Sequence, residues 1–328
     1  MVAKLISFIW NSRKIQSSLV VVIVSASVLV PSPSLSADLS KVGTIAYIAA
    51  EGGRDAIFIK GSKGSNTIFN CAYENEIILT PSVSRDGSYL SFVVDQGRNE
   101  RMLHILGPIT FSNGKWQAVD SILMMVKGGA WPIYGGENTT YLSMPNQTSL
   151  VTAPTSHIFQ IQEDRLIQLS NNQGISNHIW PLLDPSGDRI LYREIPGPEE
   201  DNQAPGRLQS VLQTIESGAQ EYHFINQNVF LEQWVNSTEV LISTNVSGEP
   251  RMRSYGLYNL ETRESQEIYR NSSRQGRLTS DSRYMATIRP VPPGGAQFDV
   301  FITDLESQDE LNLTQSPKQS ESLIGWIK

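Results

Sequence analysis

Residues 180–192 read Trp180-Pro181-Leu182-Leu183-Asp184-Pro185-Ser186-Gly187-Asp188-Arg189-Ile190-Leu191-Tyr192, and this stretch decides the fold. It begins with an aromatic residue and a proline, continues with a polar Asp/Ser/Gly turn and ends with a short apolar run. Related segments begin at Pro81, Trp131, Trp234 and Leu278. Aligned on the turn, Gly87, Asn138 and Gly187 are about 50 residues apart, a period typical of propellers and solenoids.

From Val42 onward the chain consists of short apolar runs separated by Gly, Asn, Asp, Ser and Pro. Such runs predict strands, and the polar clusters between them predict turns. Each repeat has room for four strands, which is the composition of one propeller blade. The runs include 44–48, 56–59, 89–94, 102–106, 190–193, 240–243 and 300–302.

Five repeats are complete, and we expect the sixth blade to be split between the two ends of the chain. The C-terminal run, 323–328, contains Trp326 but lacks a following turn and strand. The missing strand is present near the other end, at 43–47. Pairing of these two strands would close the ring and remove an exposed sheet edge. The sequence therefore predicts an all-β, six-bladed propeller of four-stranded antiparallel blades; the alternative is a β-sandwich with accidental spacing.

At these positions the chain resembles the TolB-type propeller repeat, whose pattern is Pro-x-Trp-Ser-Pro-Asp-Gly-x-x-Ile-Ala-Phe. Residues 184–192 and 84–92 match it best, whereas the turns at 134–138 and 234–238 have lost the Asp-Gly pair. The resemblance covers residues 43–328 and implies a propeller-only relative, since the family's namesake also carries an α/β domain. It further implies an exported protein that binds protein partners of the cell envelope.

The N-terminal segment 1–37 is predicted to be an export signal. Lys4, Arg13 and Lys14 precede a short apolar core at 19–30, and small residues follow near Ala37. A retained membrane anchor is the alternative. The domain prediction is thus a signal over 1–37 and a propeller over 38–328. Removal of the signal changes the net charge from −7 to −10, which argues against nucleic acid or an anionic membrane as partner.

The sequence contains no Gly-x-Ser-x-Gly elbow, no His-Glu-x-x-His and no phosphate-binding loop. The single cysteine, Cys71, cannot form an intrachain disulfide. The four histidines are isolated from one another in the sequence: His104, His157, His178 and His223. We expect them at surface or strand positions rather than as metal ligands. Four carboxylates could converge on a central channel as in glycosidases, although the turns explain them equally: Asp86, Glu137, Asp184 and Glu232. We expect no cofactor or metal and no enzymatic activity.

Four repeating tryptophans are expected to pack between blades rather than to stack on a ligand: Trp131, Trp180, Trp234 and Trp326. Asp86, Asp184 and Asp281 are expected to form turns. The loops that join the second and third strands all emerge at one end of the channel, and those at 196–207 and 290–297 are long. Long loops on a rigid scaffold commonly carry binding sites. The candidate partner-binding residues at this end are Arg98, Arg101, Glu199, Glu200, Asp201, Arg207, Arg251, Arg253 and Gln297.

Together these features predict an exported, non-enzymatic scaffold that binds a protein or peptide partner of the cell envelope through its loop-rich face. By the TolB resemblance the partner would be of the envelope-lipoprotein type and the compartment the periplasm. Contact with a membrane would occur only through a partner or an uncleaved signal. The alternative function is a propeller hydrolase, such as a glycosidase or lactonase, or a glycan-binding protein that uses the channel mouth. A third possibility is a structural envelope protein without a specific ligand.

Overall fold

The structure, a computed structural model, describes residues 39–97, 100–145, 155–163, 165–170, 176–197, 208–291, 297–316 and 320–328. These residues belong to one compact unit, Ser34–Lys328. The predicted export signal at 1–37 lies outside the described residues. Among the residues that are described, no helix is long and apolar enough to cross a membrane.

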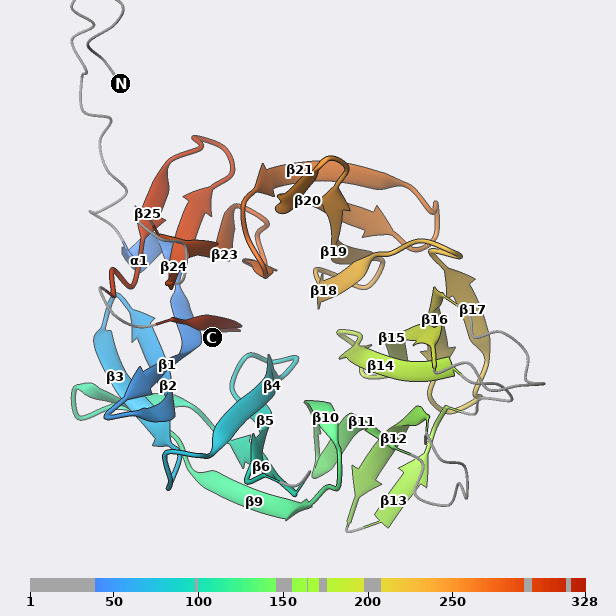
Figure 1. Cartoon of the computed structure of the whole chain (residues 1–328), viewed down its shortest axis with the longest axis horizontal. Coiled ribbons are helices and arrows are strands. Elements are labelled where there is room, and N and C mark those ends of the chain that lie inside the picture. Colours follow the sequence, from blue (N-terminus) through green and yellow to red (C-terminus); the bar gives the residue numbers. More distant parts are fainter. Residues whose placement is uncertain are drawn as a thin grey trace, which may run out of the picture. The chain divides into compact units, whose positions relative to one another are not determined.

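Six antiparallel four-stranded sheets form the six blades of a propeller (Figure 1). Each blade begins with an inner strand beside the central axis and ends with an outer strand. Blade 1 comprises β26 (Ser322–Ile327), β1 (Thr44–Glu51), β2 (Arg54–Gly61) and β3 (Gly64–Asn70). Blade 2 comprises β4 (Ile77–Val83), β5 (Leu90–Asp95), β6 (Arg101–Leu106) and β9 (Asp120–Met125). Blade 3 comprises β10 (Ala130–Gly136), β11 (Thr139–Pro145), β12 (Ser156–Gln162) and β13 (Arg165–Gln168).

The other three blades follow the same order. Blade 4 comprises β14 (Ser176–Leu183), β15 (Arg189–Pro196), β16 (Gln209–Thr214) and β17 (Gln220–His223). Blade 5 comprises β18 (Phe230–Trp234), β19 (Glu239–Val246), β20 (Glu249–Asn259) and β21 (Ser265–Asn271). Blade 6 comprises β22 (Gly276–Leu278), β23 (Tyr284–Pro290), β24 (Phe298–Asp304) and β25 (Glu310–Asn312). A short helix, α1 (Leu39–Val42), precedes β1.

The ring closes as the sequence predicted, by pairing of the first and last strands. β1 and β26 are antiparallel neighbours, with Thr44 opposite Ile327 and Ile45 opposite Trp326. Figure 1 shows β26, which carries the C-terminus, beside the blue N-terminal strands. Because the inner strand of blade 1 comes from the opposite end of the sequence, blade 1 cannot form unless the whole ring is assembled.

Two elements were not predicted: the short helix α1 and a hairpin between the third and fourth strands of blade 2. β7 (Thr110–Ser112) pairs with β8 (Lys115–Gln117) around Asn113 and Gly114, both of which have positive φ. An Asn-Gly pair between apolar residues is a strong hairpin signal, so this hairpin could have been predicted from the sequence. The hairpin covers the outer edge of blade 1, since the Asn66 side chain bonds both backbone groups of Trp116.

The core is a series of apolar layers between neighbouring blades rather than one central cluster. Ile57 and Ile59 of blade 1 pack with Leu90 and Phe92 of blade 2, and all four are fully buried. Equivalent layers continue around the ring. The middle strands, such as β5 and β16, are buried at nearly every residue, and because successive side chains point to opposite faces, both faces of each sheet are covered. The single cysteine, Cys71, is buried without a disulfide, and burial raises the pKa of its thiol to about 12.

Candidate functional site

The channel has two ends, which the antiparallel strand order defines. The turns between inner and second strands lie at the end that we call the hairpin end. The loops between second and third strands lie at the opposite end, together with the crossings between blades, and we call this the loop end. The predicted binding residues belong to the loop end.

Three inner strands contribute a row of aromatic rings that contact one another from blade to blade. Trp131 of β10 contacts Trp180 of β14 edge to face, with ring centroids 5.8 Å apart. Trp180 in turn contacts Phe230 of β18 at 5.7 Å. All three side chains are half-buried. Trp131 and Phe230 stand at the beginnings of their strands, so the row reaches the loop end.

A bulge in the inner strand sets the direction of the two tryptophans. Register shifts occur at the same place in blades 2, 3 and 4, and Thr80, Trp131 and Trp180 have φ near +50° there. Left-handed backbone is costly for such side chains, so surrounding contacts must hold it in place. One of these contacts is a hydrogen bond of 2.7 Å from the Trp131 amide to the Thr80 hydroxyl of the preceding blade.

Arg253 extends the aromatic row on blade 5. Its guanidinium carbon lies 3.9 Å from the centre of the Phe230 ring, a cation–π distance. Its Nη1 also donates to the hydroxyl of Ser243 at 3.0 Å. That hydroxyl donates to the buried carboxylate of Glu232 at 2.6 Å. The arginine is therefore held in one orientation by an aromatic ring and by a buried polar partner.

The polar chain continues from Glu232 to the next two blades. The other carboxylate oxygen of Glu232 accepts a hydrogen bond of 2.9 Å from Nη1 of Arg277 in blade 6. Nε of Arg277 donates to the carbonyl of Ile324 in blade 1 at 3.1 Å. Glu232 is buried, the guanidinium of Arg277 compensates its charge, and the Ser243 hydroxyl donates to its other oxygen. This arrangement explains a buried carboxylate in the channel wall without any catalytic role.

The structure places four of the nine predicted binding residues, and the others lie outside the described residues: Arg98, Glu199, Glu200, Asp201 and Arg207. Arg101 is braced by Asp95 at 3.0 Å and by the carbonyls of Gly128 and Gly129. Arg251 is exposed, and Gln297 accepts a backbone hydrogen bond from Val291 at the base of a long loop. Only Arg253 is built into the aromatic row. A binding role for each of the nine stays a prediction.

At the hairpin end, a cavity of about 540 Å³ enters the channel. Two half-buried tryptophans in its wall bridge neighbouring inner strands. Trp234 Nε1 donates to the carbonyl of Leu182, and Trp326 Nε1 donates to the carbonyl of Arg277, both at 3.1 Å. These contacts confirm that the repeated tryptophans join adjacent blades. They are half-buried at the channel, however, rather than enclosed in the core.

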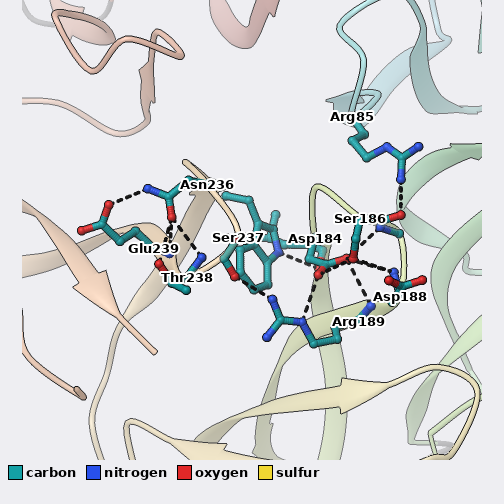
Figure 2. A network of polar contacts seen from close by, with 12 residues as sticks. Arg85, Asp184, Ser186, Asp188, Arg189, Asn236, Ser237, Thr238 and Glu239 are labelled. Carbon is teal, nitrogen blue, oxygen red and sulfur yellow. Dashed lines mark hydrogen bonds and ion pairs between the residues drawn. The ribbon is translucent and has the colours of Figure 1, made fainter. Parts of the chain in front are cut away.

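The turn aspartates act as predicted, and Asp184 has the most extensive contacts. Its Oδ1 accepts backbone hydrogen bonds from Gly187, Asp188 and Arg189, and its Oδ2 accepts one from Arg189 Nε (Figure 2). Burial pushes the Asp184 pKa upward, but these hydrogen bonds outweigh it and hold the pKa below its usual value. Asp86 and Asp281 bond the backbone of Ser88 and Arg283 in the same way. Turn formation thus accounts for these three carboxylates.

All four histidines lie on strands, one of the two kinds of position that were predicted, and all four are buried; the rings of two of them are in contact. The rings of His157 and His178 are 5.6 Å apart, and His178 Nδ1 lies 2.7 Å from the hydroxyl of Ser170. Burial, together with His157, lowers the pKa of His178 to about 3. Within the described parts of the chain, no group of three or more His, Cys, Asp or Glu side chains could hold a metal ion.

Sequence reasoning missed the aromatic partner of Arg253 and the polar chain behind it. Phe230 precedes the repeat motif of blade 5, where the turn pattern is degenerate, so the alignment did not include it. In the sequence, Glu232 was considered only as one of four carboxylates that could converge on the central channel. In the structure Glu232 lies at the register shift of its inner strand, where blades 3 and 4 have Pro132 and Pro181; the alignment of Trp234 with Trp131 and Trp180 did not show this equivalence.

Comparison with known proteins identifies the fold. No protein-family profile matches the sequence, and no curated protein is similar to it. Among solved structures, TolB from Acinetobacter baumannii is similar with a TM-score of 0.57 and 13% identity, over 86% of this chain and 67% of that protein. The chain thus has the fold of a TolB-type six-bladed propeller.

Other structures with this fold have different activities. Hydrazine synthase from Kuenenia stuttgartiensis has a TM-score of 0.54 and 9% identity, over 86% of this chain and 47% of that one. Oligogalacturonate lyase from Vibrio parahaemolyticus has a TM-score of 0.50 and 11% identity, over 80% and 75%. At such low identities the likeness concerns the scaffold, and function must be argued from the site.

Proposed function

We propose that the chain is a non-enzymatic propeller scaffold that binds a protein or peptide segment at the loop end of its channel. The observation that carries this proposal is the row formed by Trp131, Trp180 and Phe230, with Arg253 stacked on Phe230. Trp and Arg are the residue types that most often dominate protein interfaces. Here they are partly exposed and fixed before any partner arrives, so little side-chain entropy is lost on binding.

The buried chain behind Arg253 supports a role for its positive charge. An arginine that is needed only for packing does not require a serine and a buried glutamate to orient it. The partner segment would therefore present an apolar or aromatic group to the row and an acidic group or carbonyl to Arg253. We propose an exported, periplasmic location from the composition of residues 1–37, and a partner in the cell envelope from the TolB resemblance.

The test is a capture experiment with the full chain, purified after expression from its complete coding sequence and incubated with an envelope extract. The informative variant is Arg253→Ala, and its matched control is Arg85→Ala, which removes an exposed arginine at the hairpin end. We expect one or a few proteins to bind to the wild type and to Arg85→Ala, and to be lost with Arg253→Ala. Equal capture by both variants would contradict a site at the loop end.

A second candidate is a sugar-binding or hydrolytic site in the hairpin-end cavity. The specific observation in its favour is the cavity of about 540 Å³ with Trp234 and Trp326 in its wall, since sugars commonly stack on such rings. Glu232, the buried carboxylate of this wall, is already bound by Arg277. Glycan-array binding that is abolished by Trp234→Ala and unchanged by Arg253→Ala would favour this candidate.

A further inference from the structure

Two arginines at the loop end of blades 5 and 6 stack on phenylalanine rings. The guanidinium carbon of Arg253, on β20, lies 3.9 Å from the centre of the Phe230 ring, and that of Arg274 lies 3.8 Å from the centre of Phe298. Arg274 belongs to the crossing from β21 to β22, and the crossings lie at the loop end. Arg274 is exposed whereas Phe298 is buried, so the guanidinium covers the ring from the solvent side. Each arginine therefore has one face on a ring and keeps N–H groups for a partner.

The crossing that carries Arg274 is bound to both blades. The Arg274 amide donates to the carbonyl of Ile288 in blade 6 at 3.1 Å, and the Ile288 amide donates to the carbonyl of Gln275 at 3.3 Å. On the other side, the hydroxyl of Ser273 lies 2.5 Å from that of Tyr255 in blade 5. The backbone of this arginine is thus fixed before any partner arrives, which lowers the entropic cost of binding.

The charges of Arg253 and Arg274 are not used by the described part of the chain. The ion pairs of blades 5 and 6 are made there by other arginines, namely Arg270, Arg277, Arg283 and Arg289. The carboxylates of this region that the structure describes interact with those arginines or with neutral groups: Glu232, Glu249, Glu267, Asp299, Glu310 and Glu321. Two positive charges at the loop end are therefore available to an outside group.

The surface next to the two arginines is apolar. The aromatic row extends over blades 3 to 5, and the crossing from blade 4 to blade 5, residues 224–229, contains no charge and exposes Ile225 (57%). The loop end thus changes from apolar to basic between blade 4 and blade 6. The crossing from blade 1 to blade 2 has the opposite charge, because it exposes Glu74. This order of surfaces favours a segment whose acidic residues lie over blades 5 and 6.

We infer that the partner segment, whose binding rests on the function proposed above, carries two acidic side chains beside its apolar group, and that Arg253 and Arg274 bind one each. An arginine binds a carboxylate through parallel N–H···O hydrogen bonds, and the stacked ring holds the guanidinium plane for this contact. The net charge of the whole chain is −7, which disfavours extended polyanions such as nucleic acid at the same site. The ligand class is therefore an acidic protein segment with an aromatic or large apolar residue.

The test is a selection of random peptides of about 12 residues, displayed on phage, against the immobilised full chain. We expect enrichment of peptides that combine an aromatic residue with two Asp or Glu residues. One enriched peptide is then labelled and its dissociation constant is measured by fluorescence polarisation. Arg274→Ala should weaken its binding about tenfold, and Arg85→Ala, the control at the hairpin end, should leave it unchanged.

A second set of variants separates charge recognition from simple packing on Phe298. Replacement of one acidic residue of the peptide by its amide should weaken wild-type binding about tenfold and should have little further effect on Arg274→Ala, because both changes remove the same contact. Arg274→Lys, which keeps the charge and loses the planar guanidinium, should recover only part of the affinity. Circular dichroism confirms that each variant is folded.

The possible outcomes distinguish this inference from the function on which it rests. Enrichment of aromatic peptides without acidic residues would overturn the inference and leave a peptide-binding scaffold in place. Failure to enrich any peptide would contradict the scaffold function itself. Equal binding by the wild type and Arg274→Ala would show that this arginine only covers Phe298, and loss of binding in Arg85→Ala would place the acidic site at the hairpin end; either result would overturn the inference.

Discussion

Arg85 and Ser186 join two blades that are not neighbours. The Arg85 guanidinium, in the turn of blade 2, donates to the carbonyl of Ser186 in the turn of blade 4 (Figure 2). The turn of blade 3 lies between them and consists of Glu137 and Asn138, both with positive φ. Because that two-residue turn is short, the arginine can pass it. The turn of blade 3, which has lost the Asp-Gly pair, is thus short enough for Arg85 to reach from blade 2 to blade 4.

Two arginines of this network allow a matched stability comparison. Arg189 bonds the buried Asp184 carboxylate at 3.0 Å and the Ser237 carbonyl of blade 5 at 2.6 Å, whereas Arg85 bonds only a carbonyl. Arg189→Ala should lower the free energy of unfolding by about 2 kcal/mol, because it leaves a buried carboxylate without its cation. Arg85→Ala should cost about 0.5 kcal/mol. Urea unfolding of both variants checks this, and equal losses would contradict it.

The architecture was predictable because each repeat contains its own fold information. The Asp-Gly turn, the apolar run after it and the unmatched Trp326 together specify blades and a closed ring, and the structure has both. The hairpin at 110–117 was missed because the repeat period does not include it, although Asn113-Gly114 indicated it.

The site was only partly predictable, since it depends on contacts between blades. Arg253 was predicted as a residue of the loop after the second strand of blade 5, whereas it lies on β20, and its stacking on Phe230 and its link to Glu232 join residues from separate strands. The meeting of His157 and His178 likewise required the placement of blade 4 against blade 3. The sequence pattern of a single repeat does not predict contacts between side chains of different blades.

The buried His178 should make stability depend on acid. Its pKa is lowered to about 3 in the folded protein, from an ordinary value of 6.5, so the unfolded chain binds a proton first as pH falls. The folded state therefore loses stability between about pH 6.5 and about pH 3, by up to about 1.4 kcal/mol per pH unit. His178→Asn should flatten this part of the curve. Unfolding free energies at pH 7, 6, 5 and 4 test it, and parallel curves for the two proteins would refute it.

Glu321 should have the opposite dependence. Burial raises the pKa of its carboxyl above the ordinary value of 4.5, and the nearby Asp299 adds to this despite hydrogen bonds from Ser316 and Thr314. The folded state then holds the proton more tightly than the unfolded chain. Stability from this group is present below pH 4.5 and is lost as pH rises through the folded pKa. The advantage of the wild type over Glu321→Gln should consequently shrink between pH 4 and pH 7; an advantage that grows would exclude this account.

Ring closure should be sensitive to the size of residue 325. Gly325 lies in β26, opposite Ala46 of β1, and a Cβ added there would be 2.8 Å from Cγ2 of Val83 on the inner strand of blade 2. Gly325→Ala should therefore force the closing strand away from its neighbour, at a cost of about 1–3 kcal/mol.

The double variant Gly325→Ala with Val83→Ala provides the control, because the smaller neighbour removes the close contact. Val83 is half-buried, so its own truncation should be mild. If the clash is the cause, the two substitutions together should cost less than the sum of their separate effects, with a coupling above about 0.5 kcal/mol in thermal or urea unfolding. Strict additivity would show instead that the closing strand adjusts freely, and that the interface between blades 1 and 2 does not depend on a glycine at this position.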